Sequence, residues 1–424
     1  METVMDYSAF GQKFAAKSGI VDLMDDLGTA LNENPNMLFM GGGNPGRIPE
    51  IEAFFQDKLL DIAQDEEKRH SLLGIYQSPQ GEKAFRVQLS NYLKETFNWS
   101  ISERNIAIAN GSQSAFFLIY NMLAGTMSDG RKKSIHFPLS PEYIGYADAG
   151  ISDDFFTATQ PAIEIIDQHT FKYHVDFSQL KIDDSIAALS VSRPTNPTGN
   201  VITDDEIHHL DALAKKANIP LIIDGAYGLP FPNILFTKAK PFWNENTILV
   251  LSLSKLGLPG IRTGIVIGNE QFIQDFTSAN TITNLACGNL GPALSKDLFA
   301  NNDIKTLTDI VTPFYHQKAQ QTVAEFKSAL AGLPFKIHQP EGAIFLWLWF
   351  DNLPITAKAL YQRLKNKGVL IIPGEDFFIG VDKSWPHQYQ CIRVSYAQDE
   401  KVVKKGIAII AQELHQLYKS DQEN

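Results

Sequence analysis

The stretch TILVLSLSKLGLPGIRTGIVIG, residues 247–268, places two short apolar runs on either side of a polar loop. Short apolar runs that are bounded by glycine, proline and polar residues are typical of buried strands. The loop between these two runs contains Ser252, Ser254, Lys255 and Arg262. The stretch therefore predicts two buried strands, the first of which ends in hydroxyl and cationic side chains.

The same alternation of apolar runs and helical patterns extends along most of the chain. Helical spacing over residues 51–62 predicts an amphipathic helix, and Thr203 with Glu206 fits the capping box of a helix start. Further strand-like runs occupy residues 106–110, 134–137, 186–191 and 221–224. Strands separated by helices indicate a mostly parallel sheet with helices on both faces, which places the chain in the α/β class.

The pattern changes after about residue 313, where strands and helices are grouped differently. The run YHQKAQQTVAEFKSALAG predicts a long helix, and residues 401–418 predict a final helix. Between them the runs GAIFLWLWF, VLIIPG and CIRVSYA predict strands, the first of them buried on both faces. We expect three parts: an N-terminal segment (1–45) that packs with the small domain, a large domain (46–312) and a small C-terminal α+β domain (313–424).

Composition and charge limit the classes of function. The chain has 424 residues, of which 44% are hydrophobic and 20% charged, so a folded globular protein is expected. Its 37 basic and 48 acidic side chains give a formal charge of −11, which argues against nucleic acid as the main partner. METVMDYSAF lacks the features of a signal peptide, and no uncharged apolar run reaches the roughly 18 residues of a membrane span.

The cysteines and histidines indicate a reducing compartment and no metal site. Cys287 and Cys391 are too few for a disulfide framework or a cysteine-based zinc site. The ten histidines form no ligand pattern, and His208 and His209 fit the polar face of a helix. We therefore expect a soluble cytoplasmic protein that has no bound metal and no membrane partner.

Two groups of side chains at strand ends fit one phosphate group. Ser112 and Gln113 follow an apolar run and open a helix, whose N-terminus offers backbone amides and a positive dipole end to an anion. Ser252 and Ser254 add hydroxyl donors, and Arg262 adds a cation that can bind an anion through two hydrogen bonds. Because functional groups gather at the carboxyl ends of strands in such a sheet, we expect these residues to meet.

Two further residues define the rest of the ligand. Asp224 ends the run LIID and is suited to a protonated ring nitrogen, while Lys255 is suited to forming a Schiff base with an aldehyde. A phosphate, an aldehyde and a pyridine nitrogen occur together in pyridoxal phosphate. The sequence therefore predicts a pyridoxal-phosphate enzyme.

The same residues carry a family resemblance over essentially the whole chain. SLSKLGLPGIRTG (252–264), RPTNPTGN (193–200), DGAY (224–227) and CIRVSY (391–396) resemble the fold-type-I pyridoxal-phosphate aminotransferases, in the same order. GGGNPGRIPE, NGSQSAFF, PEYIGYADAG and EGAIFLWLWF resemble the valine–pyruvate aminotransferase group within that superfamily. The resemblance implies a large domain, with a mostly parallel seven-stranded-type sheet sandwiched by helices, and a smaller α+β domain.

The resemblance also implies roles for the residues around the cofactor ring. Lys255, Asp224 and Tyr227 are the candidate catalytic residues. Lys255 would bind the cofactor aldehyde and then move a proton between the substrate and the cofactor, and Asp224 would keep the ring nitrogen protonated. Asn196 and Tyr227 would bind the phenolic oxygen of the ring, and Tyr143 would stack on its face.

Four residues are implied in substrate binding and in the contact between subunits. Arg393 would bind the substrate carboxylate through two hydrogen bonds, with Asn196 and the backbone of Gly43 beside it. Tyr76, in GIYQSPQG, resembles the tyrosine that reaches the phosphate of the neighbouring subunit. That match implies a homodimer with shared active sites.

One glycine-rich run allows a different interpretation. GGGNPG (41–46) satisfies the G-x-G-x-x-G pattern of dinucleotide-binding proteins, and Asp61 lies twenty residues after Gly41. That interpretation requires the acidic residue at the end of a second strand, whereas Asp61 lies within the helix predicted over residues 51–62. A glycine-rich turn beside an active site is the favoured interpretation.

The resemblance predicts a ping-pong exchange of the amino group between L-valine and pyruvate, giving 3-methyl-2-oxobutanoate and L-alanine. TITNLACGNLGPAL (281–294) contains no arginine for a second carboxylate, which favours a neutral substrate. The alternatives are a transaminase for another neutral or aromatic amino acid, a β-lyase or decarboxylase of the same fold, and a regulatory ligand-binding protein. The net charge and the lysine at position 255 disfavour the regulator.

Overall fold

The computed structural model describes residues 5–16 and 19–422. The helices are α1 (Ala9–Ala15), α2 (Gly19–Glu33), α3 (Pro49–Gln64), α4 (Glu66–Leu73), α5 (Lys83–Phe97), α6 (Ser112–Leu123), α7 (Asp204–Lys216), α8 (Glu270–Asn284), α9 (Leu290–Ala300), α10 (Asp303–Ala329), α11 (Ala357–Asn366) and α12 (Glu400–Gln422). Short 3-10 turns are η1 (Glu103–Asn105), η2 (Ile144–Tyr146), η3 (Ser254–Leu256), η4 (Pro259–Ile261), η5 (Gly374–Phe377) and η6 (Pro386–Gln390).

The strands form two larger sheets and one short pair. They are β1 (Leu38–Phe39), β2 (Ile106–Ala109), β3 (Gly125–Thr126), β4 (Lys132–Phe137), β5 (Phe156–Ala158), β6 (Ala162–Asp167), β7 (Thr170–His174), β8 (Ile186–Ser192), β9 (Leu221–Asp224), β10 (Thr247–Ser252), β11 (Gly264–Ile267), β12 (Phe335–His338), β13 (Phe345–Phe350), β14 (Val369–Leu370), β15 (Ile372–Pro373) and β16 (Cys391–Ser395).

The first sheet has the strand order β2-β11-β10-β9-β8-β4-β3, and β5 also pairs with β4. The pairs β10–β9, β9–β8, β8–β4 and β4–β5 are parallel, whereas β11 is antiparallel to both β2 and β10, and β3 is antiparallel to β4. Seven strands, together with the two-residue β3, therefore make up this sheet. The mostly parallel sheet expected from the sequence is confirmed, and β11 runs antiparallel to β10 because the segment between them holds only η3 and η4 and no crossover helix.

Helices cover both faces of this sheet and bury its central strands β8, β9, β10, β11 and β2. Leu249 and Leu251 of β10 pack into one core, which also includes residues of α7, whereas Ile248 and Val250 pack into a second core with residues of α6 and α8. This alternation follows from the two-residue period of a strand. The predicted capping box is present at the start of α7, where Thr203 Oγ1 accepts from Glu206 N at 3.2 Å.

The second sheet, ordered β15-β16-β13-β12-β7-β6, belongs mainly to the C-terminal part of the chain. The predicted strand GAIFLWLWF contains β13, which is antiparallel to β12 and β16 and is almost fully buried. Strands β6 and β7, however, come from the middle of the chain, within the segment assigned to the large domain. The sequence pattern did not identify them because β6 is an exposed edge strand without a long apolar run.

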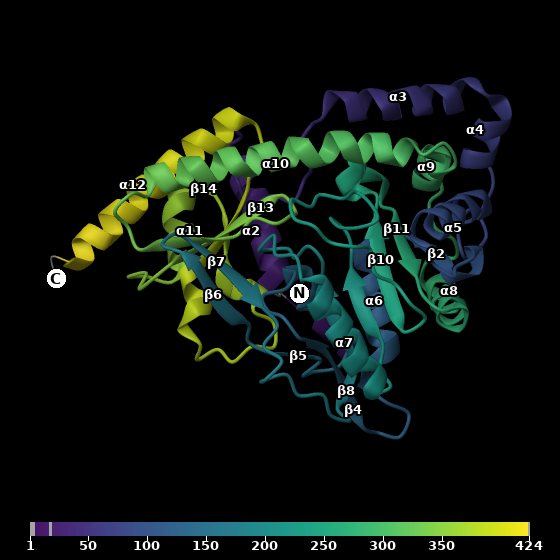
Figure 1. Ribbon diagram of the computed structural model, residues 1–424, viewed down its shortest axis with the longest axis horizontal. Coiled ribbons are helices and arrows are strands. Elements are labelled where there is room, and N and C mark those ends of the chain that lie inside the picture. Colours follow the sequence, from purple (N-terminus) through teal and green to yellow (C-terminus); the bar gives the residue numbers. More distant parts are fainter. Residues whose placement is uncertain (1–4, 17–18, 423–424) are drawn as a thin grey trace.

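The long helix predicted after Pro313 begins earlier than expected. Helix α10 starts at Asp303 and continues through Pro313, crossing both sheets along the top of Figure 1. Buried contacts of Ile304, Leu307 and Val311 hold the first turns in place despite the missing N–H of the proline. The predicted boundary between residues 312 and 313 therefore lies inside a continuous helix. The domain limits remain a prediction.

The N-terminal segment contacts both parts of the molecule. Strand β1 pairs in parallel with β14, and Asp26 of α2 accepts hydrogen bonds from Tyr361 and Lys365 of α11. Helix α1 instead lies beside the large sheet, where Lys13 Nζ donates to the carbonyl of Ser152 at 2.8 Å. Residues 1–4 and 17–18 of the predicted segment lie outside the described residues. No helix in residues 5–16 or 19–422 is both long and apolar enough to span a membrane.

A buried ion pair beside the second sheet binds the segment that follows β8. Lys172 Nζ, on β7, donates to the carboxylate of Glu341, to Asn200 Oδ1 at 2.7 Å and to the carbonyl of Val201 at 3.2 Å. Glu341 also accepts from Val201 N at 2.9 Å. Removing one member of such a pair leaves the other charge buried and unbalanced.

We expect Lys172→Met to lower the free energy of unfolding by about 3 kcal/mol, because it leaves the Glu341 carboxylate without its buried cation. Urea denaturation of the purified protein measures this change. Lys305→Met, which removes an exposed ion pair with Asp309 on α10, is the matched control and should cost less than about 1 kcal/mol. Equal losses in the two variants would contradict the structural role of the buried pair.

Candidate active site

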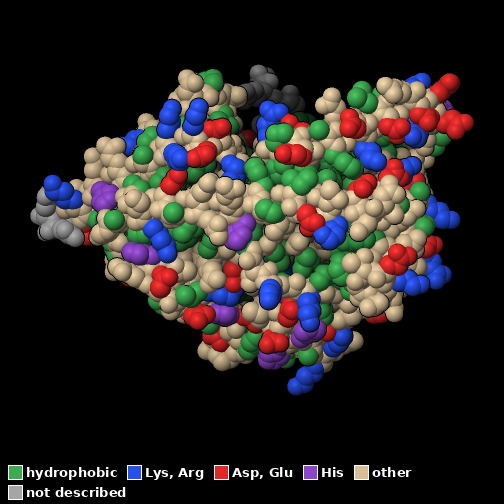
Figure 2. All heavy atoms as spheres, turned by 45° about the horizontal axis from the view of Figure 1, so that its top comes forward, with side chains coloured by type: hydrophobic (Ala, Val, Ile, Leu, Met, Phe, Trp, Pro, Cys, Tyr) green, Lys and Arg blue, Asp and Glu red, His purple; other side chains and the backbone are tan. Residues whose placement is uncertain are grey.

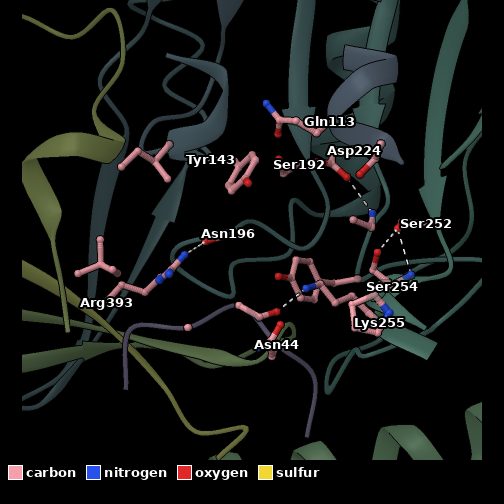
Figure 3. A pocket seen from close by; sticks show the side chains of 18 of the residues that line it. Asn44, Gln113, Tyr143, Ser192, Asn196, Asp224, Ser252, Ser254, Lys255 and Arg393 are labelled. Carbon is pink, nitrogen blue, oxygen red and sulfur yellow. Dashed lines mark hydrogen bonds between the residues drawn. The ribbon is translucent and has the colours of Figure 1, made fainter. Parts of the chain in front are cut away.

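A cavity of about 450 Å³ lies at the carboxyl ends of β8, β9 and β10, where the two parts of the molecule meet. Most of the residues predicted for the site line this cavity: Gly43, Ser112, Gln113, Tyr143, Asn196, Asp224, Tyr227, Ser252, Ser254, Lys255, Arg262 and Arg393. Figure 3 shows the labelled side chains, among them those of Tyr143, Lys255 and Arg393, around this cavity. The fold thus brings together residues as distant in sequence as Gly41 and Arg393, which are 352 positions apart.

One end of the cavity carries groups that are suited to binding an anion. Helix α6 begins at Ser112, directed by Gly111 in a left-handed backbone conformation (φ 89°), so the free amides of the first turn face the cavity. A Cβ at Gly111 would lie 2.6 Å from Arg262 Nη2, so glycine lets the guanidinium approach the helix start. Ser252 Oγ donates to Ser254 Oγ at 3.0 Å beside them.

Asp224 ends β9 and lines the cavity, and its carboxyl group accepts two hydrogen bonds. Tyr146 Oη donates to Asp224 Oδ2 at 2.5 Å, and Ala226 N donates to Asp224 Oδ1 at 2.8 Å. Burial raises the pKa of Asp224, while these hydrogen bonds and the charge of Lys255 favour the ionised form. A cationic N–H group placed in the cavity would compensate the buried carboxylate, which is what a protonated pyridine nitrogen provides.

Lys255 lies in the first turn after β10 and reaches toward the centre of the cavity. Its Nζ donates to the carbonyl of Gly43 at 2.5 Å and lies 5.1 Å from the centre of the Tyr227 ring. Burial, together with the cationic Arg393 and Arg262, lowers the pKa of Lys255 to about 8. A substantial fraction of this amine is therefore neutral and nucleophilic near physiological pH.

We expect Lys255 in the cofactor-free protein to react with an amine-directed acylating reagent with a midpoint near pH 8, because its lowered pKa exposes the neutral amine there. Peptide mass spectrometry after brief labelling at a series of pH values measures the midpoint. In the urea-unfolded chain the same lysine should need about pH 10.4. The same midpoint in both states would contradict the effect of the cavity.

Arg393 forms the opposite end of the cavity. Its Nη1 donates to Asn196 Oδ1 and its Nη2 to the carbonyl of Gly41, both at 2.7 Å. The guanidinium packs 4.1 Å from the ring centre of Phe345, and burial lowers its pKa to about 10. Arg393 makes no salt bridge with any residue in the described ranges. A buried cation without a protein counter-ion is suited to a substrate carboxylate.

Arg393→Lys is expected to reduce kcat/KM for the amino acid about a hundredfold, because a lysine cannot hold a carboxylate through two parallel hydrogen bonds. Steady-state kinetics with the holoenzyme measures the loss. Cofactor affinity is the internal control, because Arg393 lies at the other end of the cavity from the anion site. A loss confined to cofactor affinity would contradict the proposed substrate contact.

The structure places the remaining predicted residues as follows. Tyr143 and Asn196 line the cavity, and Gln113 Nε2 donates to the carbonyl of Gly145 at 2.8 Å, next to the loop of Tyr143. Tyr76 does not line the cavity and is 83% exposed. Its contact with the phosphate of a second subunit stays a prediction.

The glycine-rich run GGGNPG borders the cavity, as the favoured interpretation expects. Gly41, Gly42 and Gly43 are among its lining residues. Asp61, in contrast, lies on the exposed side of α3 and pairs with Lys68 at 2.7 Å. A dinucleotide site requires this acidic residue at the end of a strand, whereas Asp61 lies within helix α3.

Sequence reasoning missed three residues of the site. Tyr146 binds Asp224 directly, and Glu142 binds Ser192, which lines the cavity at the end of β8. Tyr146 could have been found because it follows Tyr143 by three residues in the same motif. Ser192 ends its strand in the same way as Asp224 does. Nothing in the sequence distinguishes Glu142 from an exposed acid.

Residues 54–410 match the family model of aminotransferase class I and II. The chain belongs to this family. It is 49% identical over 98% of its length to valine–pyruvate aminotransferase of Escherichia coli K12, covering 99% of that protein. It also resembles the crystal structure of a putative amino-acid aminotransferase from Psychrobacter arcticum, with 43% sequence identity, a TM-score of 0.95 and coverage of 98% of this chain and 100% of that chain. A second similar crystal structure is that of valine–pyruvate aminotransferase from Salmonella typhimurium, with 47% sequence identity, a TM-score of 0.87 and coverage of 95% of this chain and 100% of that chain.

The cofactor of this aminotransferase family is pyridoxal phosphate, and the cavity fits it. The anion site at the start of α6 suits the phosphate, Asp224 suits the ring nitrogen and Lys255 suits the aldehyde. The cavity is basic at both ends although the whole chain carries a charge of −11. On the face drawn in Figure 2, acidic and basic side chains are interspersed.

Proposed function

We propose that this aminotransferase exchanges the amino group between L-valine and pyruvate, giving 3-methyl-2-oxobutanoate and L-alanine. The observation that carries the proposal is the apolar wall of the cavity, where Leu27, Phe39 and Ile372 lie in the same cavity as Arg393. The basic lining residues described are Lys255, Arg262 and Arg393. Each of the three already has a role, which favours a substrate side chain without a charge. The 49% identity to the Escherichia coli enzyme also supports the proposal.

Three residues of the chain have separate roles in the proposed reaction. Arg393 holds the substrate carboxylate and so fixes the orientation of the Cα–H bond. Lys255, once its amine is free, takes the proton from the Cα of the amino-acid donor. In the reverse half-reaction the same amine returns a proton to Cα. Bound pyridoxal phosphate supplies an aldehyde for the amino group and a ring that accepts electrons. Asp224 keeps a proton at the ring nitrogen, which strengthens that electron demand.

The test is a donor panel with pyruvate as acceptor, measured on the purified holoenzyme. We expect valine and 2-aminobutyrate to be used with rates within about a hundredfold of each other, because an apolar pocket discriminates weakly per methylene. Aspartate should react at least about a hundredfold more slowly than valine, because its second carboxylate would be buried without a cation. Equal rates with aspartate and valine would overturn the neutral substrate, and a marked preference for phenylalanine would favour an aromatic one.

We also infer that the enzyme works as a homodimer in the cytoplasm. Large apolar side chains are exposed on the single chain, including Ile282 (88%) and Leu285 (61%). Tyr76 is also exposed, which is expected of a residue that contacts a neighbouring subunit. Cys287 and Cys391 are buried free thiols, in keeping with a reducing compartment. Light scattering of the purified protein tests the dimer, and a monomer that retains full activity would contradict it.

A further inference from the structure

Glu142 is a buried acid at the edge of the active site to which the reaction assigns no role. It is 1% exposed and directly precedes Tyr143. Its carboxyl group accepts from Ser192 N at 2.8 Å and contacts Ser192 Oγ at 2.6 Å. Tyr143 N also donates to it, at 3.3 Å. A buried carboxyl group is costly unless its hydrogen bonds are satisfied, and here the two partners it binds both line the cavity.

These bonds complete a closed chain of contacts under the cofactor site. Ser192, the last residue of β8, lies opposite Asp224 in the register with β9, and Arg193 N donates to the Asp224 carbonyl at 2.8 Å. Tyr146, four residues after Glu142, donates to the Asp224 carboxylate. The loop from Glu142 to Tyr146 is therefore fastened to the sheet at both ends, once through Ser192 and once through Asp224.

Tyr143 lies between these two fastened points and presents its ring to the cavity (Figure 3). Its ring stands at 90° to that of Tyr146, with the centres 5.2 Å apart. A shift of the loop at Glu142 would thus move the wall of the cofactor site and the donor to Asp224 together. Burial raises the pKa of Glu142 to about 8, and the nearby Asp224 adds to the rise. The role of Glu142 therefore depends on its hydrogen bonds and not on a permanent negative charge.

We propose that Glu142 is a positioning residue, whose hydrogen bonds to Ser192 hold the loop of Tyr143 and Tyr146 against the cofactor ring and Asp224. The proposal concerns the cofactor site and rests on none of the substrate assignments made under the proposed function. It is therefore tested without any amino-acid substrate.

Two substitutions separate the geometry of Glu142 from its charge. Glu142→Gln keeps the length and can still bond to Ser192, whereas Glu142→Asp keeps the carboxyl group but is one methylene too short to reach it. We expect Glu142→Asp to weaken the affinity of the apoenzyme for pyridoxal phosphate about tenfold and Glu142→Gln to weaken it less than about threefold. The visible circular dichroism of the bound cofactor should also fall in Glu142→Asp and be restored in Glu142→Gln.

Absorbance titration of the apoenzyme with pyridoxal phosphate measures the affinity, and Glu245→Asp, at an exposed acid, is the matched control. Unchanged affinity and circular dichroism in Glu142→Asp would overturn the positioning role. A loss in Glu142→Gln that equals or exceeds the loss in Glu142→Asp would also overturn it, because the length that Glu142→Gln keeps would then not be what the site requires. The preference for valine over aspartate is measured separately, so failure of that assignment leaves these outcomes unaffected.

Discussion

Replacing Lys255 with alanine is expected to lower the rate of amino transfer by about ten thousandfold or more. The lysine is the one described basic side chain that lies between the anion site and Arg393, with its Nζ bonded to the Gly43 carbonyl. The variant loses both the amine that binds the cofactor aldehyde and the base that moves the proton at the substrate Cα. Alanine formation from valine and pyruvate, followed over hours at high enzyme concentration, measures the residual rate.

The control for this variant is Lys305→Ala, which removes an exposed lysine of α10 that pairs with Asp309. Its activity should match that of the unmodified enzyme. Added methylamine should restore part of the activity of Lys255→Ala, because a free amine can replace the missing base in the cavity. Turnover that survives Lys255→Ala undiminished would overturn the mechanism.

Asp224→Asn is expected to lower kcat about a thousandfold, because a neutral amide does not stabilise a proton on the cofactor ring nitrogen. The amide has nearly the same shape, so the contacts with Tyr146 and Ala226 limit the structural change. Single-turnover kinetics with valine isolates the step at the substrate Cα from product release.

Tyr146→Phe is the matched control for Asp224→Asn. It removes a donor to the carboxylate but leaves the charge, so we expect a loss of only about tenfold. If Asp224→Asn retained more activity than Tyr146→Phe, the charge of Asp224 would not be the group that activates the ring.

The sheet that carries the site could be predicted because its strands are buried on both faces. Most residues of β8, β9 and β10 are apolar, and all but Asp224 are buried, so the runs stand out from their polar surroundings. The polar residues that follow these runs were then assigned to one edge of the sheet by topology alone. The structure brings Asp224, Lys255 and Ser112 together in one cavity, as this reasoning expects.

The parts that could not be predicted depend on tertiary contacts. The sequence pattern did not place β6 and β7 in the second sheet, because β6 is an exposed edge strand and β7 joins this sheet through its pairing with β12, which is distant in sequence. Helix α10 passes through Pro313 because buried neighbours compensate a local cost. In the sequence, Glu142 cannot be distinguished from an exposed acidic residue. Its hydrogen bonds to Ser192 are seen only in the folded structure.

The most direct test of the proposed reaction is the stoichiometry of the purified holoenzyme with L-valine and pyruvate. We predict one 3-methyl-2-oxobutanoate and one L-alanine for each valine consumed, measured together by chromatography of the same sample. The exchange should also run in reverse, because the same residues serve both half-reactions. Release of ammonia or carbon dioxide from valine, or loss of valine without an equal amount of alanine, would contradict the account.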